Sequence, residues 1–217
     1  MKNKTENSTN PLTVKAFKQL LNDKKAQVID TRLPDNFEMG NIPGAINFGF
    51  NLNHGHFTQL LFKIDTPILI ACKASEEEKS YATLREFGFT QILGHLEGGM
   101  DAWLKGSEKY DMVISISSEE LALDSKHNPK AITIDTREAD EFNTLHVGNA
   151  LNMPLTELTD SYGSLNKLDE VLIYSNNGFR SMIAASFLKK EGFANIKNVW
   201  GGFEKIKQET VDLVGKK

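Results

Sequence analysis

The feature that most constrains this chain is an internal repeat. Residues 28–32 read Val-Ile-Asp-Thr-Arg, and residues 133–137 read Thr-Ile-Asp-Thr-Arg, 105 positions later. Further along, Leu-Ile-Ala-Cys at 69–72 is matched by Leu-Ile-Tyr-Ser at 172–175. Two copies of about 100 residues are too few and too long for a solenoid, so the repeat predicts two homologous domains.

The repeat also suggests where each domain begins and ends. A Gly-Gly pair at 98–99 and its copy at 201–202 stand near the end of each repeat, and a short polar stretch follows the first copy. We therefore expect a disordered polar tail at 1–10, a first domain at 11–107 and a second domain at 112–217.

Composition argues against several classes of protein. The formal net charge is -4, and Lys and Arg are spread along the chain, so nothing indicates a nucleic-acid surface. No run approaches the ~18 apolar residues that span a bilayer, and residues 1–10 lack the apolar stretch of a secretory signal. A single cysteine permits no intrachain disulfide, which is typical of a reducing compartment. We expect a cytoplasmic protein with no membrane or nucleic-acid partner.

Each repeat reads as alternating strands and helices, set by apolar spacing, β-branched runs and turn signals. The expected helices are 12–21 (capped by Thr13), 34–37 and 76–86 (ended by Gly88), and then 116–123 and 182–190. The expected strands are 28–29, one that follows the turn at 42–46, 67–71 and 91–93, and then 131–134, 171–174 and 196–199. Strands that alternate with helices predict two tandem α/β/α domains, each with a mainly parallel five-stranded sheet.

The second repeat contains a loop suited to binding an anion. Ligands of parallel sheets bind beyond the carboxyl ends of the strands, and the strand at 171–174 runs through this loop directly into a helix. Such a tight turn directs backbone N–H groups inward, and the helix dipole adds to them. Glycine permits an unusual backbone conformation, and arginine adds a planar set of donors. The expected anion-binding residues are Asn176, Asn177, Gly178, Phe179, Arg180 and Ser181.

Together these motifs resemble the rhodanese family of sulfurtransferases. The resemblance covers 12–208 and rests on Asp-Thr-Arg followed by Phe in both repeats, Ile-Pro-Gly-Ala at 42–45, Gly-Phe-Arg-Ser at 178–181 and Glu-Gly-Gly-Met-Asp-Ala-Trp at 97–103. More narrowly, 93–99 and 180–185 are similar to the tandem rhodanese modules that follow a metallo-β-lactamase-like domain in bacterial persulfide dioxygenase fusions. No His-x-His-x-Asp-His run is present, so we expect a free-standing version of such modules.

The resemblance implies a cysteine at the first position of the loop. In the family, its thiolate takes a sulfane sulfur from thiosulfate or another donor, becomes a persulfide and passes the sulfur to an acceptor. Here Ser175 occupies that position in the second repeat, and a serine hydroxyl cannot form a persulfide. Drift and deliberate inactivation of the loop are both open explanations for the serine. Ion pairs are expected to support the two loop regions through Asp30, Arg32, Asp135 and Arg137.

In the first repeat the cysteine is present, but the loop that follows it departs from the family pattern. Cys72 stands at the nucleophile position, but residues 73–78 are Glu-rich and contain neither Gly nor Arg, and Glu77 takes the position of Arg180. Carboxylates raise the pKa of a thiol above its ordinary ~8.5 and repel an anionic donor. Cys72 is therefore the second catalytic candidate, and the alternative is a small buried residue at a strand end.

The histidines indicate no further chemistry. His54 and His56 have no third ligand at a suitable spacing, and His146 matches a turn of the family, so we expect neither a metal nor a cofactor. The predicted function is that of a rhodanese-type sulfurtransferase of sulfur metabolism, with a sulfur oxyanion or sulfane-sulfur donor as ligand and a persulfide-handling protein as candidate partner. Ser175 puts catalysis in doubt, and the alternative is a non-catalytic anion-binding or protein-interaction module. A phosphatase, with its longer cysteine loop ending in Arg, fits less well.

Overall fold

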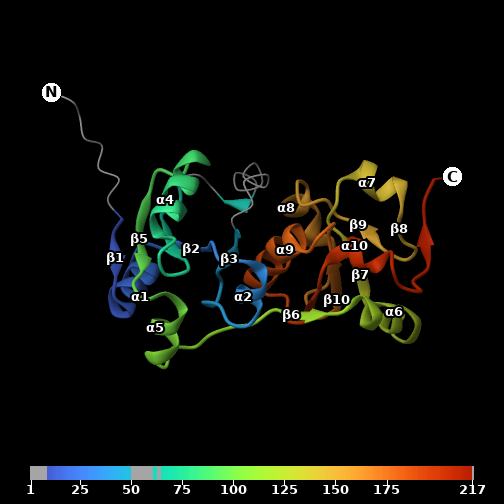
Figure 1. The fold of residues 1–217 in the computed structure, drawn as a ribbon, viewed down its shortest axis with the longest axis horizontal. Helices are drawn as coiled ribbons and strands as arrows, with labels where there is room; N and C mark the ends of the chain where they lie inside the picture. Colours follow the sequence, from blue (N-terminus) through green and yellow to red (C-terminus); the bar gives the residue numbers. More distant parts are fainter. Residues whose placement is uncertain (1–8, 50–60, 63–64, 217) are drawn as a thin grey trace. The chain divides into compact units, whose positions relative to one another are not determined.

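The structure is a computed structural model that describes residues 9–49, 61–62 and 65–216. Residues 1–8 of the expected tail, and both His54 and His56, lie outside this described part. The chain divides into two compact units (Figure 1). The first contains the chain up to Leu33 together with Asn41–Tyr110, and the second contains Pro34–Gly40 together with the chain from Asp111 onward.

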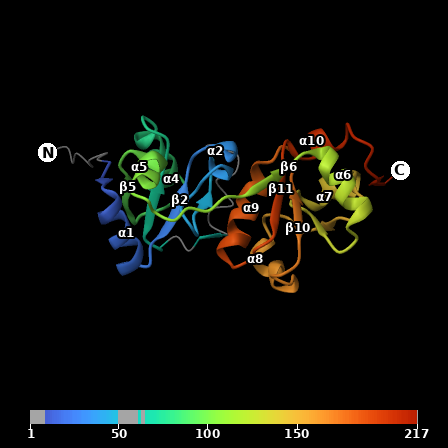
Figure 2. The ribbon, with the colours of Figure 1, turned by 90° about the horizontal axis from the view of Figure 1, so that it is seen from below.

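Five parallel strands form the sheet of the first unit. Their order is β1-β5-β4-β2-β3, and every neighbouring pair is parallel. The strands are β1 (Pro11–Leu12), β2 (Gln27–Asp30), β3 (Ile46–Asn47), β4 (Ile68–Ala71) and β5 (Ile92–Leu96). Helices lie alongside this sheet (Figures 1 and 2), namely α1 (Val14–Asp23), α4 (Glu77–Glu86) and α5 (Gly99–Lys105).

The sheet of the second unit repeats this topology. Its order is β6-β11-β10-β7-β9, which corresponds to the first sheet strand for strand, and all its pairs are parallel. Its strands are β6 (Ile114–Ile116), β7 (Ile132–Asp135), β9 (Leu151–Asn152), β10 (Val171–Tyr174) and β11 (Ile196–Val199). The predicted fold, two α/β domains with mainly parallel five-stranded sheets, is confirmed.

The remaining elements of the second unit surround this sheet. A short antiparallel pair joins β8 (His146–Val147) to β12 (Leu213–Val214). The helices are α2 (Pro34–Glu38), α6 (Ser118–His127), α7 (Ala139–Thr144), α8 (Leu158–Ser161), α9 (Phe179–Lys190) and α10 (Gly202–Ile206), with a 3₁₀ turn at Tyr162–Ser164.

The middle strands are the most deeply buried elements. All four residues of β4 and all four of β10 are buried, which is why both strands read as uninterrupted apolar runs. In the second unit β10 contributes Leu172 and Tyr174 to a core that also contains Leu121 of α6 and Phe203 of α10. Each large apolar side chain buried in this way stabilises the fold by about 1.5–3 kcal/mol. The buried middle strands therefore hold the loops at their carboxyl ends in a fixed position.

Two predicted helices begin later than the sequence indicated. The helix predicted at 12–21 is α1 at Val14–Asp23, because Leu12 belongs to strand β1 and the Thr13 side chain accepts a hydrogen bond from the backbone N–H of Ala16. The prediction of a helix at 116–123 is wrong at its start, because Ile116 ends strand β6. Ser117 then caps α6 in a capping box with Glu120.

Candidate functional site

The two candidate loops occupy corresponding places in the two units. Cys72 directly follows β4 and Ser175 directly follows β10, and each of these strands is the middle strand of its sheet. The neighbouring strand ends with an aspartate in both units: Asp30 pairs with the residue before Cys72, and Asp135 pairs with the residue before Ser175. The two loops therefore lie at the carboxyl ends of equivalent strands, as the repeat predicted.

The Ser175 hydroxyl lies beneath its loop and has hydrogen-bond partners on both sides. Its side chain is fully buried, and its Oγ accepts a hydrogen bond from the backbone N–H of Gly178 at 3.1 Å. The same oxygen donates to Ser181 Oγ at 3.3 Å, and Ser181 Oγ donates to Asn198 Oδ1 at 2.7 Å. Ser175 Oγ is therefore held by the backbone turn on one side and by Ser181 on the other, and Ser181 is itself hydrogen-bonded to Asn198.

The backbone of this loop turns directly into helix α9. Gly178 has φ +92°, the left-handed region that favours glycine, and it is the N-cap of α9. Asn177 Oδ1 accepts a hydrogen bond from the backbone N–H of Phe179 at 3.4 Å. The first N–H groups of a helix have no partner within the helix, so the start of α9 directs donors toward the loop. Within the loop, the N–H group of Gly178 already donates to Ser175 Oγ, and that of Phe179 already donates to Asn177 Oδ1.

A second glycine motif fastens the base of the loop. The backbone N–H groups of Phe203 and Glu204, at the start of α10, donate to the carbonyl oxygens of Ser175 (2.7 Å) and Asn176 (3.0 Å). Gly202 has φ +58°, and a Cβ at this position would lie only 2.3 Å from the carbonyl oxygen of Ser175. In the first unit a Cβ at Gly99 would lie 2.9 Å from the carbonyl oxygen of Cys72. The Gly-Gly motif of each repeat therefore permits a close contact with the candidate loop.

The guanidinium of Arg180 already has an ion-pair partner within the second unit. Its guanidinium donates to both carboxylate oxygens of Glu141, at 2.7 and 2.9 Å, and Glu141 lies on α7. Partial burial works against ionisation of Glu141, but the hydrogen bonds and the charge of Arg180 hold its pKa below the ordinary value. A bound anion would therefore compete with an internal carboxylate for this arginine.

The predicted supporting residues form a matching ion pair in each unit. Arg32 Nη2 lies 2.5 Å from Asp30 Oδ2, and Arg137 Nη2 lies 2.6 Å from Asp135 Oδ2. Both aspartates are fully buried. The Arg137 guanidinium also stacks on the ring of Phe203, 3.8 Å from its centroid, and so connects β7 to α10. These pairs link neighbouring segments at the loop edge of each sheet.

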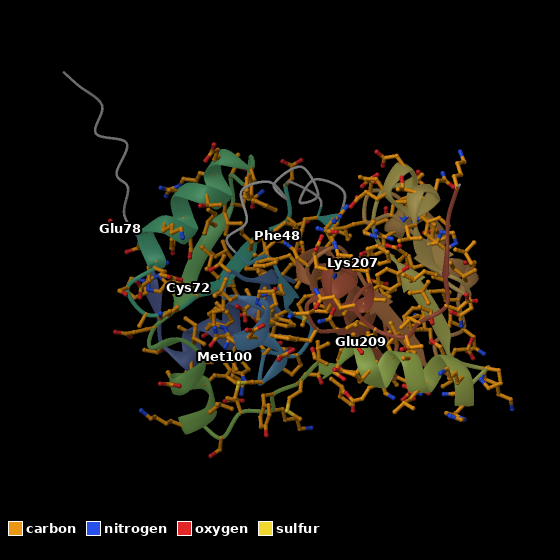
Figure 3. The ribbon with its side chains drawn as sticks, turned by 45° about the vertical axis from the view of Figure 1, so that its right-hand side comes forward. Phe48, Cys72, Glu78, Met100, Lys207 and Glu209 are labelled. Carbon is orange, nitrogen blue, oxygen red and sulfur yellow. The ribbon has the colours of Figure 1, made fainter. Side chains whose placement is uncertain are left out.

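The Cys72 loop is a different electrostatic environment. Ser75 adopts φ +72°, so a serine takes the left-handed conformation that Gly178 takes in the second unit. Cys72 is buried, inside the first unit and between Glu78 and Met100 in the view of Figure 3. Burial, followed by the negative charge of Glu77, raises the pKa of the Cys72 thiol to about 12, while a hydrogen bond with Ser80 acts in the opposite direction. The thiol is therefore neutral at physiological pH.

A tyrosine and a histidine lie near this thiol. The hydroxyl of Tyr81 lies 3.4 Å from His95 Nδ1, and it accepts a hydrogen bond from the backbone N–H of Asn10 at 3.0 Å. Burial lowers the pKa of His95 below its ordinary value of 6.5, although the charges of Glu77 and Glu97 act in the opposite direction. Sequence reasoning did not single out Tyr81, His95, Asn198 or Glu141, because their partners are distant in the chain.

Neither a metal centre nor a membrane span occurs among the described residues. Within 9–49, 61–62 and 65–216, no three side chains of His, Cys, Asp or Glu come together as a metal site requires. In the same part of the chain, no helix has both the length and the apolar character needed to cross a bilayer. His146 bonds through Nδ1 to the carbonyl oxygen of Phe142 at 2.7 Å and stacks on its ring.

Comparison with known proteins finds relatives of both units. The sequence profile of the family described as "Rhodanese-like domain" matches residues 13–106 and 118–209. The chain is 31% identical over 96 residues to the "Putative sulfur carrier protein YrkF" of Bacillus subtilis (strain 168), and this match covers 44% of the chain and 52% of that protein. The chain thus spans about half the length of that relative.

Two further relatives match a single unit. The chain is 30% identical over 73 residues to "Thiosulfate sulfurtransferase GlpE" of Coxiella burnetii, a match that covers 34% of this chain and 68% of that protein. The crystal structure of a rhodanese-related protein from Thermoplasma volcanium is 27% identical, with a TM-score of 0.43, and covers 48% of this chain and 99% of that one.

Proposed function

Because the chain belongs to the rhodanese family, with rhodanese-like domains at 13–106 and 118–209, we propose that its second domain binds a small sulfur oxyanion or sulfane-sulfur donor without transferring the sulfur. The observation that carries this proposal is the hydroxyl of Ser175. It occupies the position of the family's nucleophile, beneath a loop that is otherwise shaped for an anion.

The serine oxygen at position 175, in place of a cysteine sulfur, is the reason that we expect no sulfur transfer. In sulfur transfer from thiosulfate, a cysteine thiolate attacks the outer sulfur, the S–S bond breaks, and sulfite leaves with the electron pair while a persulfide forms. A serine hydroxyl has no accessible anion at neutral pH and cannot make this bond. Cys72 is the other candidate, but its thiol has a pKa of about 12 and stands beside Glu77. Neither domain therefore provides a thiolate at neutral pH.

Binding of the anion is expected to be weak. The N–H groups at the start of α9 favour a negative ligand. The carboxylate of Glu141 already takes both of the Arg180 hydrogen bonds described above, so a ligand must displace it or bind without the arginine. This internal ion pair also favours a second function, that of a protein-interaction module in which the loop holds no ligand. Binding of thiosulfate separates the two functions.

The proposal is tested by binding and by activity on the same set of variants. The wild type is expected to bind thiosulfate weakly by calorimetry or NMR, to ignore an equal concentration of chloride, and to show no thiosulfate:cyanide sulfur transfer. Ser175→Cys is expected to gain that activity, and Arg180→Ala on this background is expected to lower it. Cys72→Ser is expected to leave the gained activity unchanged. Activity in the wild type, or a folded Ser175→Cys protein that forms no persulfide with any donor, contradicts the proposal.

The narrower relationship, to rhodanese modules of persulfide dioxygenase fusions, is part of the proposal. It predicts that Ser175→Cys accepts sulfur from a small-molecule persulfide at least as readily as from thiosulfate, and that the chain acts in the cytoplasm beside a persulfide-handling protein. A variant that uses thiosulfate and rejects persulfides argues against this narrower relationship and leaves the broader proposal standing.

A further inference from the structure

A line of hydrogen bonds runs from Ser175 into the interior of the second unit. Ser175 Oγ donates to Ser181 Oγ at 3.3 Å, and Ser181 Oγ donates to Asn198 Oδ1 at 2.7 Å. Asn198 Nδ2 donates to Ser115 Oγ at 3.3 Å, and Ser115 Oγ donates to a carboxylate oxygen of Glu38, which belongs to the same compact unit. Ser175, Ser181 and Asn198 are buried.

The groups along this line of hydrogen bonds determine which atom donates and which accepts in each bond. Burial raises the pKa of Glu38 above its ordinary value, and the hydrogen bond from Ser115 acts in the opposite direction. While Glu38 is ionised it can only accept hydrogen bonds, so the Ser115 hydroxyl donates its single proton to Glu38 and presents a lone pair to Asn198. The amide of Asn198 therefore turns its NH₂ group toward Ser115 and its oxygen toward Ser181. The single proton of Ser181 has two acceptors, that oxygen at 2.7 Å and the carbonyl oxygen of Gly178 at 3.1 Å. With either acceptor, a lone pair of Ser181 faces residue 175.

We propose that Asn198 and Ser181 are positioning residues that hold the side chain of residue 175 as a hydrogen-bond donor, and hence in its protonated form. The inference rests on the proposed function, because it concerns the same loop. It concerns how readily a cysteine restored at 175 would ionise: the lone pair of Ser181 would face the sulfur and raise the pKa of the thiol without preventing sulfur transfer. The backbone N–H of Gly178 acts in the opposite direction, because it donates to that atom in either state.

Charged groups on the surrounding elements do not remove this effect. Asp135, next to the loop on β7, is paired with Arg137, and Arg180 of α9 is paired with Glu141 of α7. Further titratable groups near the loop are Glu204 at the start of α10, which is paired with Lys207, and the buried hydroxyl of Tyr174 on β10. The two arginines are already neutralised by carboxylates, so the neutral side chains decide which protonation state of residue 175 is favoured.

In the described part of the first unit, different residues stand at the positions of this line. His95 takes the place of Asn198: it pairs with Ile70 of β4, as Asn198 pairs with Ile173 of β10. Glu78 stands in the sequence where Ser181 stands in the second repeat, counted from the head of each loop. Cys72 has a different hydroxyl partner, Ser80, which lies 2.9 Å from Thr31 Oγ1 and donates to the carbonyl oxygen of Glu76. The two repeats therefore hold residues 72 and 175 through different side chains.

The test measures ionisation and requires no sulfur donor. Four full-length proteins are compared: Ser175→Cys alone, with Asn198→Leu, with Ser181→Ala, and with both. Alkylation of the introduced cysteine by iodoacetamide is followed by peptide mass spectrometry from about pH 5 to about pH 9, across the range in which an activated thiol titrates. Peptide mapping separates this thiol from Cys72, and thermal melting checks that each variant is folded.

Asn198→Leu is expected to accelerate alkylation roughly tenfold below the thiol pKa, because Ser181 loses its shorter acceptor. The thiolate, a charged acceptor, then competes with the carbonyl oxygen of Gly178 for the proton of Ser181 and makes the stronger hydrogen bond. Ser181→Ala is expected to accelerate it less, and the addition of Asn198→Leu to Ser181→Ala is expected to change nothing further. An unchanged or slower rate with Asn198→Leu, or an acceleration that persists without Ser181, overturns the inference.

A second variant keeps the test informative if Asn198→Leu does not fold. Ser115→Ala leaves Asn198 in place and removes the acceptor of its NH₂ group, so the amide is free to turn over and donate to Ser181. It is expected to accelerate alkylation in the same direction, and an unchanged pH profile contradicts the inference. Because alkylation is independent of sulfur transfer, a protein that alkylates as expected and forms no persulfide refutes the proposed function alone.

Discussion

Cys72 is expected to be almost inert toward iodoacetamide at neutral pH. Burial and the charge of Glu77 raise its pKa above the ordinary value to about 12. A difference of about three pH units means that, at a given neutral pH, the thiolate fraction is about a thousandfold lower than that of a free cysteine. Since the thiolate is the reacting species, alkylation of the native protein should be slower by at least that factor.

The perturbation that tests this reasoning is Glu77→Gln, with Glu86→Gln at the other end of the same helix as its control. Glu77→Gln should accelerate alkylation severalfold, roughly the effect of removing one nearby charge, and should leave Cys72 far slower than a free thiol because burial is the larger cause. Glu86→Gln should have no effect. Alkylation is measured by mass spectrometry, with the urea-unfolded chain as the reference for a free thiol. Rapid labelling of the native wild type at about pH 6 would refute the reasoning and make the first domain the catalytic candidate.

Three further predictions concern the surroundings of the loops. Burial lowers the pKa of His95, so near and below the ordinary value of 6.5 the unfolded chain binds more protons than the folded chain, and the first domain loses stability as the pH falls. His95→Asn should remove this loss of stability in thermal melts across that pH range. A pH dependence that is the same with and without His95 contradicts the prediction. Gly202→Ala should lower the free energy of unfolding, measured in urea, by about 2 kcal/mol or more, because its Cβ would meet the loop carbonyl and φ is +58°. As a control, Gly163→Ala should change the free energy of unfolding by no more than about 0.5 kcal/mol, because its Cβ would meet no atom within 4 Å. Glu141→Gln should release Arg180 from its ion pair and lower the free energy of unfolding by about 1 kcal/mol. It should also raise the affinity for thiosulfate roughly tenfold, as measured by calorimetry. An unchanged affinity would show that the arginine does not contact the anion.

The middle of each sheet was predictable from the sequence, and its edges were not. The strands at 171–174 and 196–199 match β10 and β11 residue for residue. Strand β10 is the continuous apolar run of a fully buried parallel strand, whereas β11 reads Ile-Lys-Asn-Val and is apolar at its two ends alone. The edge strand β1 is two residues long and contains a proline, so it carries no periodic signal. Only the last residue of strand β6, Ile116, was predicted as the start of a helix, because it lies directly before the apolar spacing of α6.

Within the site, the residues contiguous in sequence could be identified and their distant partners could not. The loop from Ser175 to Ser181 is a local motif, and its glycine and arginine have readable roles. Glu141 lies 39 residues from Arg180, and Asn198 lies 17 residues from Ser181, so only the fold brings these pairs together. A single asparagine on a strand is indistinguishable in sequence from a residue at a solvent-facing position.

The central claim is that one atom at position 175 separates this chain from sulfur transfer. Its most direct test is the intact mass of the wild type and of Ser175→Cys after incubation with thiosulfate and removal of excess donor. The account predicts no change for the wild type and, for Ser175→Cys, a gain of the mass of one sulfur atom that is lost on adding cyanide and prevented by prior alkylation. A sulfur adduct on the wild type, or its absence from a folded Ser175→Cys protein, contradicts the account.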